Sequence, residues 1–246
     1  MRIFLTVLLI GLLFGSLSVH ADSVTSDEVR LAKLLSLKVT DVTPAPIPGL
    51  YQVTIGPLVA YVSADGRYII RGDIIDVHSG ENLTASDRAG MRLAYLQQLG
   101  TADMIVFSPI HPRHTITVLT DIDCQYCRVF ERDRPTLNAM GIAVQYLFFP
   151  IDGVGSPSWH KAMAVWCSHD RKSALETAMA GRPVTSKPCD TAAMTVGYRF
   201  GRLLGLNGTP AIITDRGRLI DGYLPPTELV SLLDAGTASV QKAANK

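Results

Sequence analysis

The sequence lacks a strong charge of either sign. It has 23 Lys and Arg residues against 22 Asp and Glu residues, a formal net charge of +1. A chain so evenly balanced has no broad attraction for nucleic acid or for an anionic membrane, so we expect no nucleic-acid partner. Internal repeats and low-complexity segments are also missing. The length of 246 residues and the 47% hydrophobic content suit one large globular domain or two small ones.

Apolar runs long enough to cross a membrane are lacking as well. The N-terminal segment "MRIFLTVLLIGLLFGSLSVHA" has a short positive start followed by an apolar run over 3–17. This run is shorter than the roughly 20 residues that a membrane span needs, although a membrane anchor is the alternative interpretation. Val19 and Ala21 have the small side chains of a cleavage site. We therefore expect residues 1–21 to be a signal peptide that is cleaved near Ala21 and directs export.

Cysteine is scarce. The chain has four cysteines, Cys124, Cys127, Cys167 and Cys189. Their number is even, and disulfides persist in the oxidising compartments that exported proteins enter. A chain of this length does not need disulfides merely to fold. The spacing of the four cysteines therefore carries information about function.

Residues 22–82 have the pattern of a small α+β unit. The spacing of apolar residues predicts a helix within 22–40, with Ser26 or Asp27 as its cap. After "PAPIPGL" come short β-rich runs, with "ADGR" as a hairpin turn. The strands carry much apolar surface for so small a unit, including Ile69, Ile70, Ile74 and Ile75. The unit either completes its core by pairing with a second copy or packs on the rest of its own chain.

A linker helix is predicted next, within 83–103. The segment "TASDRAGMRLAYLQQLG", residues 84–100, has Thr84 or Ser86 near its cap and Gly100 after its end. Beyond it, "HTITVLTDID" predicts a strand, and Cys124 follows at the C-terminal end of that strand. A helix continues through "CRVFERDR", and Pro135 should kink or interrupt it. "IAVQYLFFP" is the next strand, so the three segments predict a parallel βαβ unit.

The rest of the chain to residue 236 alternates helical and β patterns. Two segments are predicted to be helical, one around Cys167 and one after Cys189. "TPAIITDRGRLIDGY" predicts a β-hairpin with "DRG" as its turn, and "PPTELVSLLDAG" predicts a closing helix. The last ten residues, 237–246, are expected to form a loose tail.

The two close cysteines suit thiol–disulfide exchange. Positions i and i+3 of a helix share a face, so Cys124 and Cys127 can bridge across one turn. At a helix N-terminus the first thiolate meets unsatisfied N–H groups and the positive end of the helix dipole, which lowers its pKa. We therefore expect Cys124 to attack a disulfide, and the more buried Cys127 to resolve the mixed disulfide that forms.

Other sites built on this pair fit less well. A c-type haem site requires His after the second cysteine, where Arg128 stands. A structural zinc site usually adds a second close pair or His ligands, and Cys167 and Cys189 are too far apart to supply one. A structural staple would close almost no loop. We expect Cys167 and Cys189 to bond to each other, which the loop-entropy model values at roughly 3 kcal/mol; a second exchange site is the alternative.

Several blocks together resemble the DsbC family of exported disulfide isomerases. "PAPIPGLYQV" and "DGRYIIRGDIIDV" resemble that family's N-terminal dimerisation domain. "ITVLTDIDCQYC", "VWCSHD", "AMAG", "CD" at 189–190, "LGLNGTPAIIT" and "GYLPPTEL" resemble its catalytic domain. The resemblance covers nearly the whole chain after the signal peptide. The family usually has Gly after the first cysteine and before Tyr126, where this chain has Gln125.

The resemblance implies an α+β architecture in three parts. It has a cystatin-like dimerisation domain over 22–82, a linker helix over 83–103 and a thioredoxin-like catalytic domain over 104–236. A helical insertion near 151–206 interrupts the catalytic domain. In the catalytic domain, Cys124 would be the nucleophile and Cys127 the resolving cysteine. Thr209 and Pro210 match the family's cis-proline loop beside the active site, and Cys167–Cys189 would be a structural disulfide.

The resemblance also implies partners and a location. The chain would form a periplasmic homodimer with an apolar cleft that holds misfolded, disulfide-containing exported proteins. The membrane reductase DsbD would keep Cys124 and Cys127 reduced, and neither a metal nor an organic cofactor is expected. Three alternatives remain from the residues themselves: a DsbG-like reductase of oxidised single cysteines, a chaperone that only holds unfolded chains, and a zinc-binding structural protein.

Overall fold

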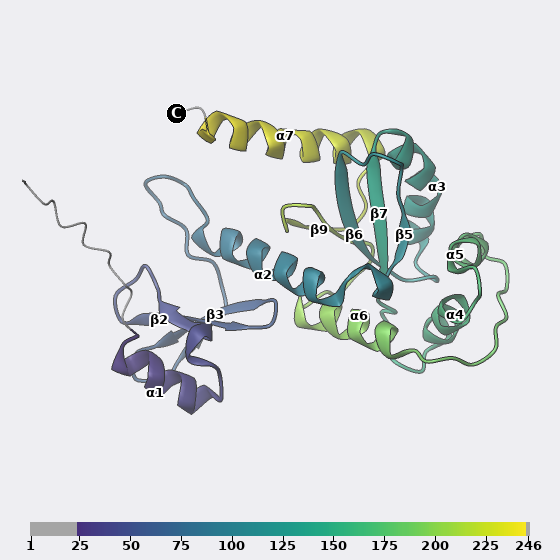
Figure 1. Ribbon diagram of the computed structural model, residues 1–246. Helices are drawn as coiled ribbons and strands as arrows, with labels where there is room; N and C mark the ends of the chain where they lie inside the picture. Colours follow the sequence, from purple (N-terminus) through teal and green to yellow (C-terminus); the bar gives the residue numbers. More distant parts are fainter. Residues whose placement is uncertain (1–23, 245–246) are drawn as a thin grey trace, which may run out of the picture.

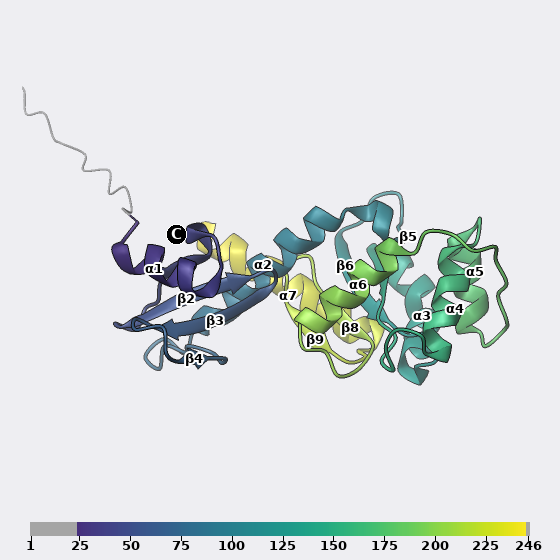
Figure 2. The ribbon, with the colours of Figure 1, turned by 90° about the horizontal axis from the view of Figure 1, so that it is seen from below.

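The computed structural model describes residues 24–244. The predicted signal peptide, 1–21, lies outside the described residues. Within 24–244 no helix combines the length and the apolar character needed to cross a bilayer. The described chain forms two units joined by a long helix, with a small sheet at one end and a larger sheet surrounded by helices at the other (Figures 1 and 2).

The N-terminal unit is one helix packed on a four-stranded antiparallel sheet of order β1-β2-β3-β4. Its elements are α1 (Ser26–Leu35), a 3₁₀ turn (Val39–Asp41), β1 (Val42–Pro44), β2 (Leu50–Ile55), β3 (Leu58–Ser63) and β4 (Ile69–Ile70). The α1 side chains Leu31 and Ala32 pack with Val42, Val53 and Val62 of the sheet. The "ADGR" segment joins the antiparallel strands β3 and β4, which confirms the predicted hairpin.

The caps of the first two helices differ from the expected ones. Helix α1 is capped by Thr25, whose hydroxyl accepts from the N–H of Glu28 while the Glu28 carboxylate accepts from the N–H of Thr25. This reciprocal pair needs Glu at the third helical position, which neither Ser26 nor Asp27 would provide. Helix α2 (Leu83–Leu99) is capped by Asn82, and Gly100 follows it as predicted.

Thr84 anchors α2 to the N-terminal sheet instead of capping it. Its fully buried hydroxyl lies 2.5 Å from the Tyr61 hydroxyl of β3 and accepts from the N–H of Ile74 at 2.8 Å. Farther along α2, Arg92 Nη1 donates to the carbonyl oxygen of Gly217 at 2.5 Å. The helix is therefore attached to the small sheet near its start and to the larger unit from its middle onward (Figure 1).

The second unit is built on a five-stranded sheet of order β5-β7-β6-β8-β9. Its strands are β5 (Ile105–Phe107), β6 (His114–Thr120), β7 (Ile142–Phe148), β8 (Ala211–Ile213) and β9 (Leu219–Asp221). Strands β6 and β7 are parallel and are joined by α3 (Gln125–Ala139), which confirms the βαβ prediction. Strands β8 and β9 form the predicted hairpin. Helix α3 continues through Pro135, so the expectation that Pro135 could interrupt the helix is wrong.

Helices cover both faces of the larger sheet. Between β7 and β8 lie α4 (Pro157–Trp166), α5 (Arg171–Met179) and α6 (Ala192–Leu203), and α7 (Pro226–Ala244) closes the chain. Alternate residues of β6 point to opposite faces. Val118 joins the core with α3 and α7, whereas Leu119 joins Phe200 of α6 and the end of α2.

The C-terminal helix is longer than expected. Helix α7 continues to Ala244, through most of the segment 237–246 that was expected to be a loose tail. The segment after Gly236 contains no proline and no further glycine, so nothing in its composition ends the helix.

Candidate active site

The two close cysteines lie where β6 gives way to α3. Cys124 is the N-cap residue of α3, and Cys127 is one turn inside the helix. Both are free thiols; Cys124 is partly exposed, whereas Cys127 is 1% exposed. The backbone N–H of Cys127 donates to the Sγ atom of Cys124 at 3.4 Å. Cys124 is therefore accessible to solvent, whereas Cys127 is buried below it.

The surroundings shift the pKa values of the two thiols in opposite directions. A hydrogen bond from Cys127, the nearby Thr209 side chain and the backbone N–H groups of the first helical turn lower the pKa of Cys124 to about 5, against the effect of partial burial. Burial raises the pKa of the Cys127 thiol far above its usual range. Near neutral pH the site therefore holds one thiolate and one thiol.

The loop before β8 faces the cysteines. The Thr209–Pro210 peptide bond is cis, and the Cys124 Sγ atom lies 3.2 Å from the carbonyl oxygen of Thr209. The carbonyl oxygen of Pro210 accepts from the N–H of Gly222 at 2.9 Å, so this loop is also tied to the end of β9. The structure thus brings Thr209 and Pro210 together with Cys124 and Cys127, four of the residues that the sequence singled out.

Two buried hydroxyls beside the cysteines have no hydrogen-bond partner within the described chain. They are the Oγ1 atoms of Thr120, the last residue of β6, and of Thr209. Both hydroxyls lower the pKa of Cys127, and Thr209 also lowers that of Cys124. An orphaned buried hydroxyl costs free energy unless it gains a partner, so these two are available to donate to a sulfur that becomes negative.

Asp121 fixes the backbone around the cysteines, a role that sequence reasoning missed. Its buried carboxylate accepts from the N–H of Asp123 at 2.8 Å, from the N–H of Ile151 at 2.9 Å and from the hydroxyl of Ser158. These bonds join the turn before α3 to the loop after β7 and to α4. The signal that could have indicated it is an Asp at a strand end, where a carboxylate commonly accepts N–H bonds two residues on.

The rim of the site is partly apolar. Gln125 and Tyr126, the two residues between the cysteines, are exposed; 62% of Tyr126 is accessible. On the neighbouring loop, Ile151 and Val154 are 44% and 66% accessible. Large apolar side chains at such exposure are available to contact another polypeptide.

The other two cysteines form a disulfide away from this rim. Cys167 follows α4, Cys189 precedes α6, and their Cα atoms are 5.5 Å apart. The bond closes a loop that contains α5. In the described part of the chain no group of three or more His, Cys, Asp or Glu side chains could hold a metal ion.

Comparisons with known proteins agree with this arrangement. The model for the disulfide bond isomerase protein N-terminal domain matches residues 19–85, and the thioredoxin-like domain model matches 102–237. The thiol:disulfide interchange protein DsbC of Escherichia coli K12 is 34% identical over 226 residues, which cover 91% of this chain and 94% of that protein. The DsbC protein of Dickeya dadantii is also 34% identical, over 96% of this chain and 97% of its own.

Solved structures share the fold of part of this chain. A disulfide interchange protein from Neisseria gonorrhoeae superposes with a TM-score of 0.50 at 25% identity, covering 55% of this chain and 96% of that one. Proteus mirabilis ScsC in a transitional conformation gives 0.51 at 18% identity, over 63% of this chain and 80% of that one, which shows the fold alone. The thioredoxin-like domain and the named relatives identify a disulfide isomerase or oxidoreductase. The chain belongs to the DsbC family of thiol:disulfide interchange proteins.

Proposed function

We propose that the chain rearranges incorrect disulfides in exported proteins through a mixed disulfide on Cys124. The Cys124 thiolate attacks one sulfur of a substrate disulfide; a new S–S bond forms, the old one breaks, and the other substrate sulfur leaves as a thiolate. A second substrate thiolate then attacks the mixed disulfide and releases Cys124 unchanged. The observation that carries this proposal is a thiol with a pKa of about 5, partly exposed above a buried second thiol.

A stalled mixed disulfide has a second way out. Cys127 attacks the Sγ atom of Cys124, the substrate leaves reduced, and the two cysteines become a disulfide. This step oxidises the site, so a dithiol donor must reduce it again; we assign that task to the membrane reductase DsbD. The donor's two thiols become a disulfide, and the Cys124–Cys127 disulfide is reduced to two thiols.

Deprotonation of Cys127 is the difficult part of this second exit, because burial favours its thiol form. The unpartnered hydroxyls of Thr120 and Thr209 support the proposal, since each can donate to the Cys127 sulfur as negative charge develops there. When Cys127 loses its proton, the two hydroxyls are therefore already placed to donate to the thiolate that forms.

The proposed substrate surface surrounds Cys124. Exposed Tyr126, Ile151 and Val154 would contact apolar segments of a misfolded chain, and the backbone beside cis-Pro210 would pair with an extended segment. Because the signal peptide predicted over 1–21 directs export, we place this activity in the periplasm.

We further propose a homodimer through the N-terminal unit. Strand β4 is the last strand of its sheet, and its Ile69 and Ile70 are 56% and 47% accessible. An exposed apolar edge strand is a template for pairing with a second copy. In this assembly 22–82 is the dimerisation domain, 83–103 the linker and 104–236 the catalytic domain. Two catalytic domains would enclose a cleft with chaperone-like binding.

Refolding of a scrambled multi-disulfide protein tests the function. Wild type should restore its activity, whereas Cys124→Ser should not, and Cys127→Ser should retain part of the isomerase activity while losing the reductase activity. Equal recovery with wild type and Cys124→Ser would overturn the isomerase proposal. If Cys124→Ala still suppresses aggregation as well as wild type, the protein holds chains without exchange. Preferential reduction of a single sulfenic acid would instead indicate the DsbG-like activity.

A further inference from the structure

A cavity of about 270 Å³ lies beside the cysteine-bearing end of α3, and the proposed exchange steps do not use it. Buried Ile122 and Ala178 form part of its lining, and the segment 181–184 forms another part. Three cationic residues also line it: Arg128, Lys161 and Arg182. This volume is ample for one acidic side chain and a few waters, which occupy about 30 Å³ each in the liquid.

The cavity adjoins the nucleophile along the chain and through hydrogen bonds. Ile122 stands two residues before Cys124, and Arg128 lies in the first turn of α3, where its N–H donates to the Cys124 carbonyl oxygen at 3.2 Å. The Nε atom of Arg128 donates to the Ile122 carbonyl oxygen at 2.9 Å. The cavity wall therefore includes residues on both sides of Cys124 in the sequence, one of them hydrogen-bonded to the Cys124 backbone.

The charges around the cavity are unequal. The Asp123 carboxylate accepts from Lys161 Nζ at 2.6 Å and from Arg128 Nη2 at 3.3 Å. Arg182 is exposed and makes no ion pair with any described residue. The three lining cations and the Asp123 carboxylate, which two of them contact, together carry a net charge of +2. The site consequently favours a further anion.

The segment that carries Arg182 is joined to the end of α5 by two backbone hydrogen bonds. The N–H of Gly181 donates to the Ala178 carbonyl oxygen at 2.9 Å, and the N–H of Arg182 donates to that of Thr177 at 3.1 Å. Gly181 has φ +76°, and Arg128 Nη1 lies 3.9 Å from where a Cβ on Gly181 would be. Gly181 and Arg128 therefore lie side by side in the cavity wall.

We propose that this cavity binds an Asp or Glu side chain of a substrate polypeptide whose cysteine reacts at Cys124. Guanidinium and ammonium groups bind carboxylates through charge-assisted hydrogen bonds. A carboxylate anchored here raises the local concentration of the neighbouring substrate sulfur at Cys124. Acidic residues near a cysteine thus become a determinant of substrate preference. This inference rests on the proposed exchange at Cys124.

Matched disulfide peptides test the inference. Each pair differs by Asp against Asn at one position within a few residues of the cysteine, and the readout is the second-order rate constant of mixed-disulfide formation. Wild type should prefer the Asp peptide, by roughly threefold to tenfold at low ionic strength, at one position or more. Added salt should reduce this preference, because it screens exposed charges.

Substitutions in the cavity test whether it causes the preference for the Asp peptide. Arg182→Gln and Lys161→Gln should bring the Asp-to-Asn ratio close to 1, and Arg182→Lys should keep part of it. Lys187→Gln removes the same charge from an exposed residue that does not line the cavity, so it should keep the wild-type ratio. Equal rates for Asp and Asn at every position, or an equal loss with Lys187→Gln, would overturn the inference. If wild type reacts with neither peptide, the proposed exchange itself fails.

Discussion

The Sγ atom of Cys124 lies 3.2 Å from the carbonyl oxygen of Thr209, although 85 positions separate them in the sequence. The N–H of Cys127 donates to this sulfur from the first turn of α3, and the loop before β8 lies against its other side. The site therefore exists only when β6 and β8 are paired, because that pairing sets the loop against the helix.

The pH dependence of Cys124 alkylation follows from its pKa of about 5. In the reduced protein the alkylation rate should rise through about pH 5 and be nearly constant at neutral pH, whereas an ordinary thiol titrates near pH 8.5. Iodoacetamide labelling followed by mass spectrometry measures it, with buried Cys127 as the internal unreactive control. A midpoint near that of an ordinary thiol would contradict the assignment.

The same lowered pKa affects the stability of the reduced protein. Because the folded pKa of Cys124 is below its unfolded value, the native state binds fewer protons between the two values, and stability rises with pH there. The contribution is fully present above about pH 8.5 and is lost as the pH falls through about 5. Urea unfolding of the reduced wild type, compared with Cys124→Ala across this range, should show the difference in slope.

The two orphaned hydroxyls should be separable by experiment. Thr120→Val removes a hydroxyl that acts on Cys127 alone, so the Cys124 alkylation midpoint should stay unchanged while resolution slows. Thr209→Val removes a hydroxyl that acts on both, so the midpoint should also move up. We expect roughly twofold to tenfold slower single-turnover reduction in each, the worth of one hydrogen bond. Identical behaviour of the two variants would contradict these roles.

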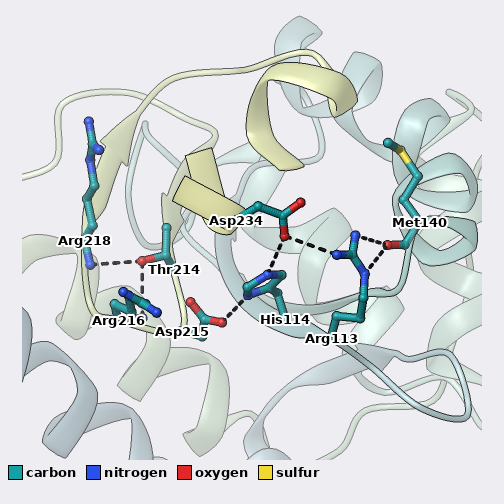
Figure 3. Close-up of polar contacts among 8 residues, drawn as sticks. All are labelled: Arg113, His114, Met140, Thr214, Asp215, Arg216, Arg218 and Asp234. Atoms are coloured by element: carbon teal, nitrogen blue, oxygen red, sulfur yellow. Dashed lines mark hydrogen bonds and ion pairs between the residues drawn. The ribbon is translucent and has the colours of Figure 1, made fainter. Parts of the chain in front are cut away.

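His114 is the centre of a polar network at the opposite end of β6 from the cysteines (Figure 3). Its Nδ1 atom lies 2.6 Å from Asp215 and its Nε2 atom 3.0 Å from Asp234, and Arg113 also contacts Asp234. His114→Ala should lower the free energy of unfolding by about 1–3 kcal/mol, because it removes a buried side chain that bonds two carboxylates. Exchange by the folded variant should be unchanged. His111→Ala, at an exposed position, should have almost no effect in the same urea titration.

Two glycines with similar backbone angles provide a matched pair. Gly217 has φ +75°, and a Cβ there would collide with the backbone of Ala89 in α2; Gly205 has φ +72° and open space around it. Gly205→Ala should cost about 1–2 kcal/mol from conformation alone. Gly217→Ala should cost more and should expose α2 to protease. Equal stabilities and equal digestion would mean that this contact does not hold the linker.

The elements carried by periodicity and turn residues were predictable from the sequence. The parallel β6–α3–β7 unit and both hairpins follow from alternation and from Gly-containing turns. Side chains that act across the fold were not. Thr84 is of a residue type that often caps helices, yet its hydroxyl is hydrogen-bonded to the Tyr61 hydroxyl and to the N–H of Ile74. Asn82 caps the helix instead. Asp121 and the three cations of the cavity converge only after β7, α4 and α5 have packed around α3.

Helix α2 is attached near Thr84 to one unit and near Arg92 to the other, with a continuous α-helix between. Each residue of an α-helix adds about 1.5 Å of length and about 100° of rotation. The number of residues between these two attachments consequently sets the direction in which Cys124 faces relative to β4. One inserted residue would turn the site by more than a quarter of a circle, whereas seven would nearly restore its heading and move it about 10 Å outward.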